Sequence, residues 1–247
     1  MIGAFRDRRV LVVGETIIDR YVLCDRPDVA GESPVMTLRP AETRSFDGGA
    51  SIVARHAAAL GARPVLVTAL PQSEEAEALC SRLRGEGVEV HSIGVDGAVP
   101  VKERYLVGAQ KVMKVDRVRP YALDASRQDA LVDLARRVSG TEWAGADPEA
   151  AIVADFGMGL LSEGVMGRVC RVLRARAGVL AGDVSGRRAR VTRMPEMDLV
   201  CPSESELRDA LGMFDEGLPA VVWRLLEQTG TRAAMVTMGP EGLVAFD

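Results

Sequence analysis

The hydrophobic positions of this chain form short apolar runs that alternate with amphipathic helical stretches. Residues 9–13 (Arg-Val-Leu-Val-Val) are typical of a strand buried on both faces. Further strands are predicted at 64–68, 88–93, 150–154, 179–182, 198–201, 233–237 and 243–246. Helices are predicted at 50–60, 74–84, 124–140, 162–176, 204–211 and 219–229. The alternation predicts an α/β fold with a doubly wound, mostly parallel sheet and helices on both of its faces.

Two segments break this rhythm. Residues 21–44 carry several prolines and have no helical period, and residues 99–117 alternate on either side of a turn at Gly108-Ala109. The first segment predicts short strands around 21–24 and 34–39, and the second predicts a hairpin. Together they are expected to form a small β lid over the carboxyl edge of the main sheet. We therefore expect residues 1–247 to be one domain with two lid segments.

Gly48 and Gly49 stand directly before the alanine-rich stretch that is predicted to be the first helix, within Asp47-Gly-Gly-Ala50. Glycine adopts backbone angles that are closed to other residues and leaves no side chain between the backbone and a ligand. The free N–H groups of a helix start also attract anions. The pair therefore predicts either a ligand-binding helix start or a plain tight turn, and the residues alone leave both open.

Charge and composition narrow the class of protein. The net charge is −4 with acids and bases interspersed, and aromatic residues make up 4% of the chain, which argues against a nucleic-acid or anionic-membrane partner. The four cysteines are widely spaced and only two histidines accompany them, so no zinc site is expected. The apolar run near the N-terminus is too short for a signal peptide or a membrane span. We expect a cytoplasmic protein with reduced thiols.

Polar residues follow the predicted strands at their carboxyl ends, where open parallel sheets bind ligands. They are Asp19, Asp155, Asp183, Ser203, Glu206, Thr237 and Gly239. Each alone is also a common turn or cap residue, but together they predict a polar site at this edge. Three familiar sites are excluded: the first turn has one glycine, Gly14, instead of G-x-G-x-x-G, and neither a P-loop nor a G-x-S-x-G elbow occurs.

The order and spacing of several motifs resemble those of the ribokinase-like (PfkB) carbohydrate kinases. The motifs are Gly14-Glu15-x-x-x-Asp19, Asp47-Gly48-Gly49-Ala50, Asp155-Phe156-Gly157, Pro202-Ser-Glu-Ser-Glu206 and Val236-Thr237-Met-Gly239-Pro-Glu-Gly242. A stretch beginning Val101-Lys102-Glu103-Arg104, with Lys111 and Lys114-Val115-Asp116 after it, resembles the heptose-7-phosphate kinase branch. The resemblance implies ATP- and Mg²⁺-dependent phosphoryl transfer to a hydroxyl of a sugar or sugar phosphate.

The resemblance also implies roles for individual residues. Substrate contacts fall to Asp19, Gly48, Gly49, Lys102, Arg104 and Asp155. Nucleotide contacts fall to Asp183, Ser203, Glu206, Thr237, Gly239 and Gly242, and Glu206 would hold Mg²⁺ through water. The family further implies a homodimer formed through the lid. Such a spread of contacts suits phosphoryl transfer, which depends on positioning and charge stabilisation.

Several residues depart from the family pattern. Ile52 stands where an asparagine usually contacts the sugar, Met158 and Ser185 replace lysines, and Ser203 replaces the asparagine of the metal motif. Ser203-x-x-Glu206 is also a helix capping box, which needs no metal. These losses favour a second hypothesis, a degenerate kinase fold that binds a sugar or a partner protein. A kinase with another acceptor, such as a nucleoside, is a third.

The family's catalytic base is an aspartate in a Gly-Ala-Gly-Asp helix start, which also supplies an anion hole. This motif does not occur in the printed sequence, and the nearest match, Gly145-Ala146-Asp147-Pro148, precedes a predicted strand. We therefore expect the base beyond Asp247, and we expect the 247-residue chain alone to be inactive.

Overall fold

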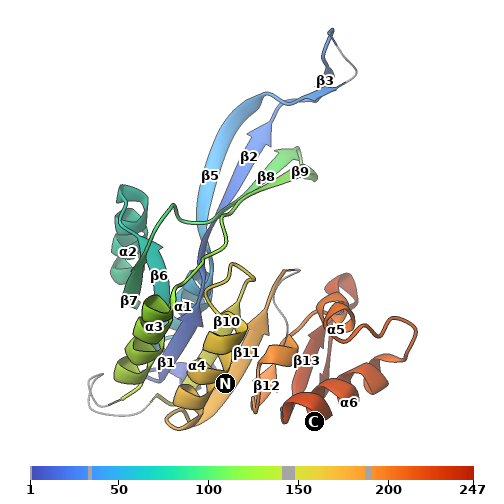
Figure 1. The fold of residues 1–247 in the computed structure, drawn as a ribbon. Helices are drawn as coiled ribbons and strands as arrows, with labels where there is room; N and C mark the ends of the chain where they lie inside the picture. The colour runs from blue at the N-terminus through green and yellow to red at the C-terminus, as the bar shows by residue number, and fades with distance from the viewer. Residues whose placement is uncertain (1, 33–34, 141–147, 187–190) are drawn as a thin grey trace.

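A parallel sheet forms the body of the computed structural model, which describes residues 2–32, 35–140, 148–186 and 191–247 (Figure 1). Eight strands of the described chain lie in this sheet, in the order β14-β13-β12-β11-β10-β1-β6-β7. Their bounds are β14 (Leu243–Phe246), β13 (Ala234–Thr237), β12 (Leu199–Val200), β11 (Val179–Val184), β10 (Ala150–Asp155), β1 (Arg9–Gly14), β6 (Arg63–Pro71) and β7 (Glu89–Val95). Neighbouring strands pair in parallel except β13 and β14, which are antiparallel.

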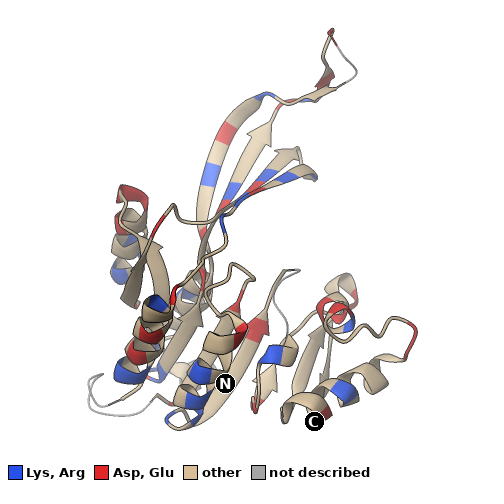
Figure 2. Cartoon of the chain, in the orientation of Figure 1, with Lys and Arg blue, Asp and Glu red and all other residues tan. Residues whose placement is uncertain are grey.

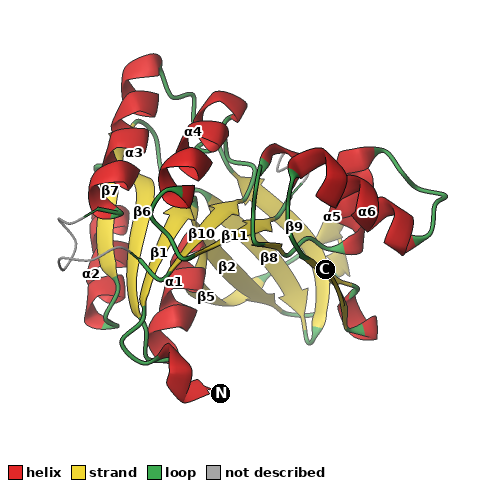
Figure 3. Cartoon of the chain, turned by 90° about the horizontal axis from the view of Figure 1, so that it is seen from below, coloured by secondary structure: helices red, strands yellow, loops and turns green. Residues whose placement is uncertain are grey.

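Helices cover both faces of the sheet, as the alternation predicts (Figure 3). The helices are α1 (Ala50–Ala59), α2 (Glu74–Gly85), α3 (Ala125–Val138), α4 (Glu163–Arg174), α5 (Glu204–Leu211) and α6 (Leu218–Thr229). Helices α1 and α2 contribute to one buried apolar cluster, and α3 to α6 contribute to the other. Short 3₁₀ turns lie at Ile2–Phe5, Val191–Arg193 and Gly239–Glu241. No helix among the described residues has both the length and the apolar character needed to cross a membrane.

Side-chain caps explain where several helices begin. Ser73 accepts the Ala76 N–H at the start of α2, and Asp124 accepts the Arg127 N–H at the start of α3. At the other end, Gly212 and Gly230 stop α5 and α6 in the left-handed conformation that glycine adopts without strain. The predicted helix starts at 74, 124 and 204 therefore lie within a residue of those in the structure.

A second sheet rises beyond the carboxyl edge of the first (Figure 1). Its order is β5-β2-β8-β9, with bounds β5 (Pro40–Gly49), β2 (Thr16–Cys24), β8 (Val101–Val107) and β9 (Gln110–Arg117). Strands β2 and β8 pair in parallel, whereas β5 and β9 are antiparallel to their neighbours. A short pair, β3 (Asp28–Val29) and β4 (Met36–Thr37), lies at the far tip. This four-stranded sheet is the lid.

The structure corrects three details of the sequence prediction. The strand predicted at 34–39 is present as the short β4, 36–37, whereas the longer strand that pairs with β2, 40–49, was not predicted. Most of this longer strand is exposed, so it shows no burial pattern to predict from. Asp19 lies inside β2, because β2 starts only two residues after β1 ends. The diglycine lies directly before α1, which begins at Ala50 with Gly49 as its N-cap, but it also ends a strand, β5, that the sequence did not predict. Residues 141–147, which include part of the Gly145–Pro148 match, and residues 187–190, which follow the strand predicted at 179–182, lie outside the described residues.

Candidate functional site

Alternation along β8 sends its charged residues to opposite faces of the lid. Lys102 and Arg104 lie in register with Asp19 and Tyr21 of β2. Glu103, between them, is buried on the other face, where it accepts hydrogen bonds from Arg20 at 3.1 Å and from Arg117 at 2.9 Å. The face that carries Asp19, Lys102 and Arg104 is called the pocket face below. Charges of both signs follow one another along these strands (Figure 2).

Asp19 is held in place on the pocket face by Arg104. The Arg104 guanidinium donates a hydrogen bond to Asp19 Oδ1 and forms an ion pair with it. The same guanidinium lies over the Tyr21 ring, 5.4 Å from the ring centroid. Both members of the pair are half-buried.

The lid meets the main sheet at a pocket of about 410 Å³. Its lining residues are Lys102, Lys114, Asp116, Val118, Pro120, Phe156, Gly157, Met158 and Gly186. The Lys102 ammonium lies over the Phe156 ring, 5.9 Å from the centroid. Burial and then the charge of Lys114 lower the pKa of Lys102, while Asp116 and Asp19 act in the opposite direction. Two cations thus share this wall of the pocket.

The diglycine packs against the root of the lid and needs to be glycine there. A Cβ on Gly48 would lie 2.9 Å from Asp19 Oδ2, and one on Gly49 would lie 2.3 Å from the Glu15 carbonyl oxygen. Gly49 also has φ of +65°, which disfavours other residues. The structure therefore brings Gly48, Gly49 and Asp19 together, as expected, and explains the glycines by close approach.

A buried pair of carboxyl groups lies beneath the pocket. Asp155 ends β10, and its Oδ1 accepts the Gly157 N–H at 2.9 Å. Glu15 is fully buried and accepts the N–H groups of Phe156 at 2.7 Å and of Leu160 at 3.1 Å. Burial and then the charge of Asp155 raise the pKa of Glu15 to about 7. Sequence reasoning included Glu15 in a motif but not among the site residues, although its place directly after a fully buried strand was a usable signal.

Asp183 and Glu206 face each other at the carboxyl ends of β11 and β12. Burial and then the charge of Glu206 raise the pKa of Asp183 to about 6. Ser203 and Glu206 form the predicted capping box of α5, with Ser203 N–H and Oγ donating to Glu206 Oε2 at 2.9 and 2.7 Å. Glu206 Oε1 accepts the Gly186 N–H at 3.2 Å. Gly186 also lines the lid pocket, so it joins the two halves of the site.

Residues at the end of β13 lie beside this acidic pair. Thr237 bridges to Ser203 and donates its N–H to the Pro202 carbonyl at 3.0 Å. Gly239 and Gly242 have φ of +59° and +97°, and a Cβ on either would meet open space. These two glycines are therefore required by the backbone turn and not by crowding, and they leave an exposed ledge next to Ser203.

The arrangement of the described residues shows whether their side chains could hold a metal ion. The described residues contain no group of three or more His, Cys, Asp or Glu side chains arranged to hold an ion directly. Both Glu206 oxygens already accept hydrogen bonds from Ser203 and Gly186. Two neighbouring carboxyl groups, Asp183 and Glu206, nevertheless concentrate negative charge, which fits a divalent cation held through its water shell.

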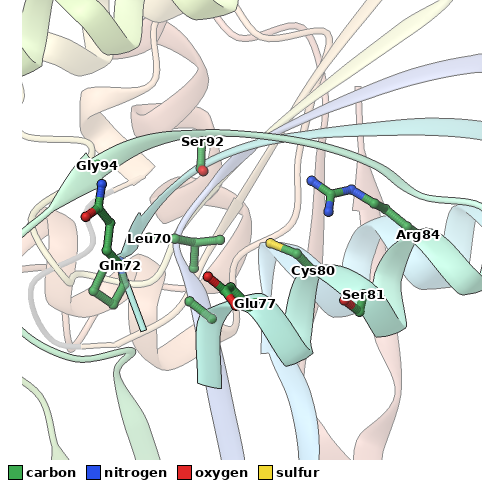
Figure 4. A pocket seen from close by; sticks show the side chains of 10 residues that line it. Leu70, Gln72, Glu77, Cys80, Ser81, Arg84, Ser92 and Gly94 are labelled. Atoms are coloured by element: carbon green, nitrogen blue, oxygen red, sulfur yellow. The ribbon is translucent and has the colours of Figure 1, made fainter. Parts of the chain in front are cut away.

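A larger pocket, of about 550 Å³, lies elsewhere, between α2 and the ends of β6 and β7 (Figure 4). Leu70, Glu77, Cys80 and Arg84 are among its lining side chains. None of its lining residues belongs to the predicted site. The smaller pocket under the lid is the candidate site because Lys102, one of the predicted substrate residues, lines it and pairs in register with Asp19 on the same face of the lid.

The chain is similar to curated proteins named bifunctional protein HldE. The chain is 30% identical over 210 residues to the bifunctional protein HldE of Azorhizobium caulinodans, covering 84% of this chain and 42% of the relative. It is 28% identical over 242 residues to the protein of the same name from Pseudomonas aeruginosa strain UCBPP-PA14, covering 97% of this chain and 48% of the relative. The chain thus spans about half the length of these relatives. No family model matches it.

Solved structures agree on the fold. Phosphofructokinase-2 from Escherichia coli, in complex with fructose-6-phosphate, superposes with a TM-score of 0.74 at 17% identity, covering 98% of this chain and 77% of that one. The chain has the ribokinase-like fold of these carbohydrate kinases. A carbohydrate kinase from Agrobacterium tumefaciens, with a TM-score of 0.63 at 17% identity, covers 97% of this chain and 73% of its own. The lid and the parallel sheet of the ribokinase-like fold are therefore both present.

Proposed function

We propose that this protein transfers the γ-phosphoryl group of ATP to a hydroxyl of a phosphorylated sugar of the heptose-phosphate type. The observation that carries the proposal is the pocket face of the lid, where Lys102 and Lys114 line the pocket and Arg104 fixes the Asp19 carboxylate. Cations of this kind neutralise a phosphate, and a positioned carboxylate accepts sugar hydroxyls. One face of the lid therefore carries partners for both the phosphate and the hydroxyl groups of a sugar phosphate.

The nucleotide half of the proposal rests on the ends of β11 to β13. Ser203, Thr237 and the ledge of Gly239 and Gly242 would form one wall of an ATP site. Mg²⁺, when bound through water near Asp183 and Glu206, would supply charge neutralisation for the transferring phosphate. Asp155, buried at the end of β10, orders the loop that begins at Phe156 through its bond to Gly157. The chain's own residues thus bind and orient the two substrates.

One observation favours the second candidate function, a non-catalytic binding protein. Met158 lines the pocket and is 7% exposed, at a position where the family pattern has a lysine. A thioether cannot stabilise a developing negative charge as an ammonium does. Binding without turnover is the outcome that this alternative predicts.

We further propose that residues 1–247 act as one domain and that two copies associate through the lid. The support is exposed apolar side chains on the lid, Phe46 and Met113, and at the β3–β4 tip beyond it, Val29, Val35 and Met36. Exposed apolar surface of this kind commonly marks an interface. The proposal includes a cytoplasmic location, in which the four free cysteines stay reduced.

Calorimetry of the protein with a panel of sugars and sugar phosphates, heptose 7-phosphate included, tests the binding half. A coupled assay of sugar-dependent ADP release tests the transfer half. Lys102→Met should weaken binding of sugar phosphates but not of the matching free sugars. Arg137→Ala, which removes one exposed positive charge from α3, is the matched control and should bind as wild type does. Absence of binding by every phosphorylated sugar would contradict the proposal, and binding without ADP release would favour the alternative.

A further inference from the structure

Glu15 joins two parts of the site through its main chain. It is the residue between β1 and β2, so it lies at the root of the lid, and it is fully buried. Its carbonyl oxygen accepts the Ala50 N–H at 2.7 Å, which fixes the start of α1 against the lid. The close approach of Gly49 to the same carbonyl makes this junction tight.

The Glu15 side chain reaches a third part, the loop that follows β10. Oε2 accepts the Phe156 N–H at 2.7 Å, and Oε1 accepts the Leu160 N–H at 3.1 Å. The loop between these two residues carries Phe156 and Met158, which line the lid pocket. A carboxylate that accepts one N–H on each oxygen fixes both ends of the loop.

The opposite side of the same loop is held by Tyr121. The Tyr121 N–H donates to the Met158 carbonyl at 2.6 Å. Gly159 has φ of +90°, and a Cβ there would lie 2.6 Å from the Tyr121 carbonyl oxygen. The loop therefore sits between Glu15 and Tyr121, and its place depends on both.

We infer that Glu15 is a positioning residue for substrate binding, because its carboxylate holds the Phe156–Met158 wall of the pocket in register with Asp19 and the diglycine. The inference rests on the proposed function, which puts a sugar phosphate in this pocket. Glu15 is fully buried, so it acts through the loop and does not touch the substrate. Shifting a wall of the pocket by a fraction of an ångström is enough to weaken binding.

If Glu15 positions the pocket wall, protonation of its carboxyl should change substrate affinity, which a purely structural role would not predict. The pKa of Glu15 is raised to about 7, first by burial and then by Asp155, against its bonds to Phe156 and Leu160. The ionisable groups that interact electrostatically with Glu15 are Asp155 of β10 and Tyr121 from the segment before α3. A protonated carboxyl turns one oxygen into a donor, which no longer accepts an N–H. Substrate affinity should therefore fall as the pH falls through 7.

Glu15→Gln tests the inference, because the amide keeps the size of the side chain but can accept at one position only. Calorimetry with the sugar phosphate that wild type binds should show about tenfold weaker binding at pH 8. The ratio of the wild-type affinity to the Glu15→Gln affinity should shrink towards pH 6, where wild type has also lost an acceptor. Any titration of the ligand itself affects both proteins equally, so it cancels in this ratio. Glu15→Asp keeps the charge on a shorter side chain, so it should bind more tightly than Glu15→Gln and more weakly than wild type. If Glu15→Gln does not fold, the affinity of Glu15→Asp tests the inference in its place.

Glu149→Gln is the matched control. Glu149 also accepts a main-chain N–H, from Arg9 at 2.7 Å, but at the amino ends of β1 and β10, away from the pocket. This variant should lose thermal stability and keep wild-type affinity at both pH values. Wild-type affinity in Glu15→Gln, or a loss equal to that of Glu149→Gln, would overturn the inference alone. Wild-type protein that binds no sugar phosphate would overturn the proposed function and this inference with it.

Discussion

Gly48 and Asp19 pack so closely that a methyl group on Gly48 would lie 2.9 Å from Asp19 Oδ2. That distance is too short for an ordinary contact, and the carboxylate on the other side is tied to Arg104. Gly48→Ala should therefore move Asp19 and weaken sugar binding by about tenfold or more, which calorimetry would detect. Gly167→Ala, in α4, has open space for its methyl group and should keep wild-type affinity with equal or higher stability.

Asp19 and Lys102 should contribute to different parts of a ligand. Asp19→Ala removes the acceptor for sugar hydroxyls and leaves Arg104 without its partner, so binding of free and phosphorylated sugars should weaken by about 1–3 kcal/mol. Competition by inorganic phosphate should be unchanged or stronger in the same variant, because a negative charge is lost. Equal sugar affinity in Asp19→Ala and wild type would assign Asp19 to the lid structure alone.

The capping box of α5 allows structural and nucleotide roles to be separated. Ser203→Ala should cost about 1 kcal/mol of unfolding free energy, as the loss of a cap does. Ser73→Ala removes the corresponding cap of α2, far from the nucleotide half, and should cost a similar amount. Titration with ATP and Mg²⁺ should show weaker binding only for Ser203→Ala. The same ATP affinity in both variants would leave Ser203 a cap and nothing more.

Asp183 should make the folded state less stable as the pH rises. Its folded pKa of about 6 lies above the ordinary aspartate value of 3.8, so the folded state holds the proton more tightly than the unfolded chain. The stability that this proton contributes is fully present below pH 4 and is lost as the pH rises through 6. Asp183→Asn should therefore be more stable than wild type at pH 8, by about 2–3 kcal/mol.

Urea unfolding at pH 8 and pH 5 measures this difference, which should be smaller at the lower pH. Asp209→Asn, on the exposed part of α5, is a control whose carboxyl has no buried position and should show no such trend. A wild-type protein that gains stability relative to Asp183→Asn as the pH rises would contradict the assignment of burial as the dominant cause.

The sequence predicted the main sheet well because its central strands, such as β1 and β6, are buried on both faces. Residues 10–14 of β1 are all buried, so an unbroken apolar run marks the strand and the polar residue that follows marks the ligand edge. The lid was harder, because residues 40–46 of β5 are exposed and follow no hydrophobic period. Their strand structure comes from pairing with β2, which local sequence does not encode.

The walls of the pocket were predicted only in part. Lys102 was found through its resemblance to a family motif, whereas Phe156 and Met158 line the pocket because Glu15 and Tyr121 hold their loop. The contact between Glu15 and Phe156 joins residues 141 positions apart. Side-chain-to-backbone bonds over such separations leave no periodic signal in a sequence, so Glu15 was missed as a site residue.

The parallel pairing of β2 with β8 has a consequence for the order of folding. Strands β8 and β9 are joined by a two-residue turn, so their hairpin forms from local contacts, but the Asp19–Arg104 bond closes a loop of 85 residues. Closing such a loop is slow and costs chain entropy, so the two halves of the lid should join late, after β6, α2 and β7 have packed. Asp19 and Lys102 come from opposite sides of that junction. The chain therefore acquires its ligand-binding surface only after the segment between the two halves of the lid has folded, and a newly made molecule should become able to hold a ligand later than it forms β6, α2 and β7.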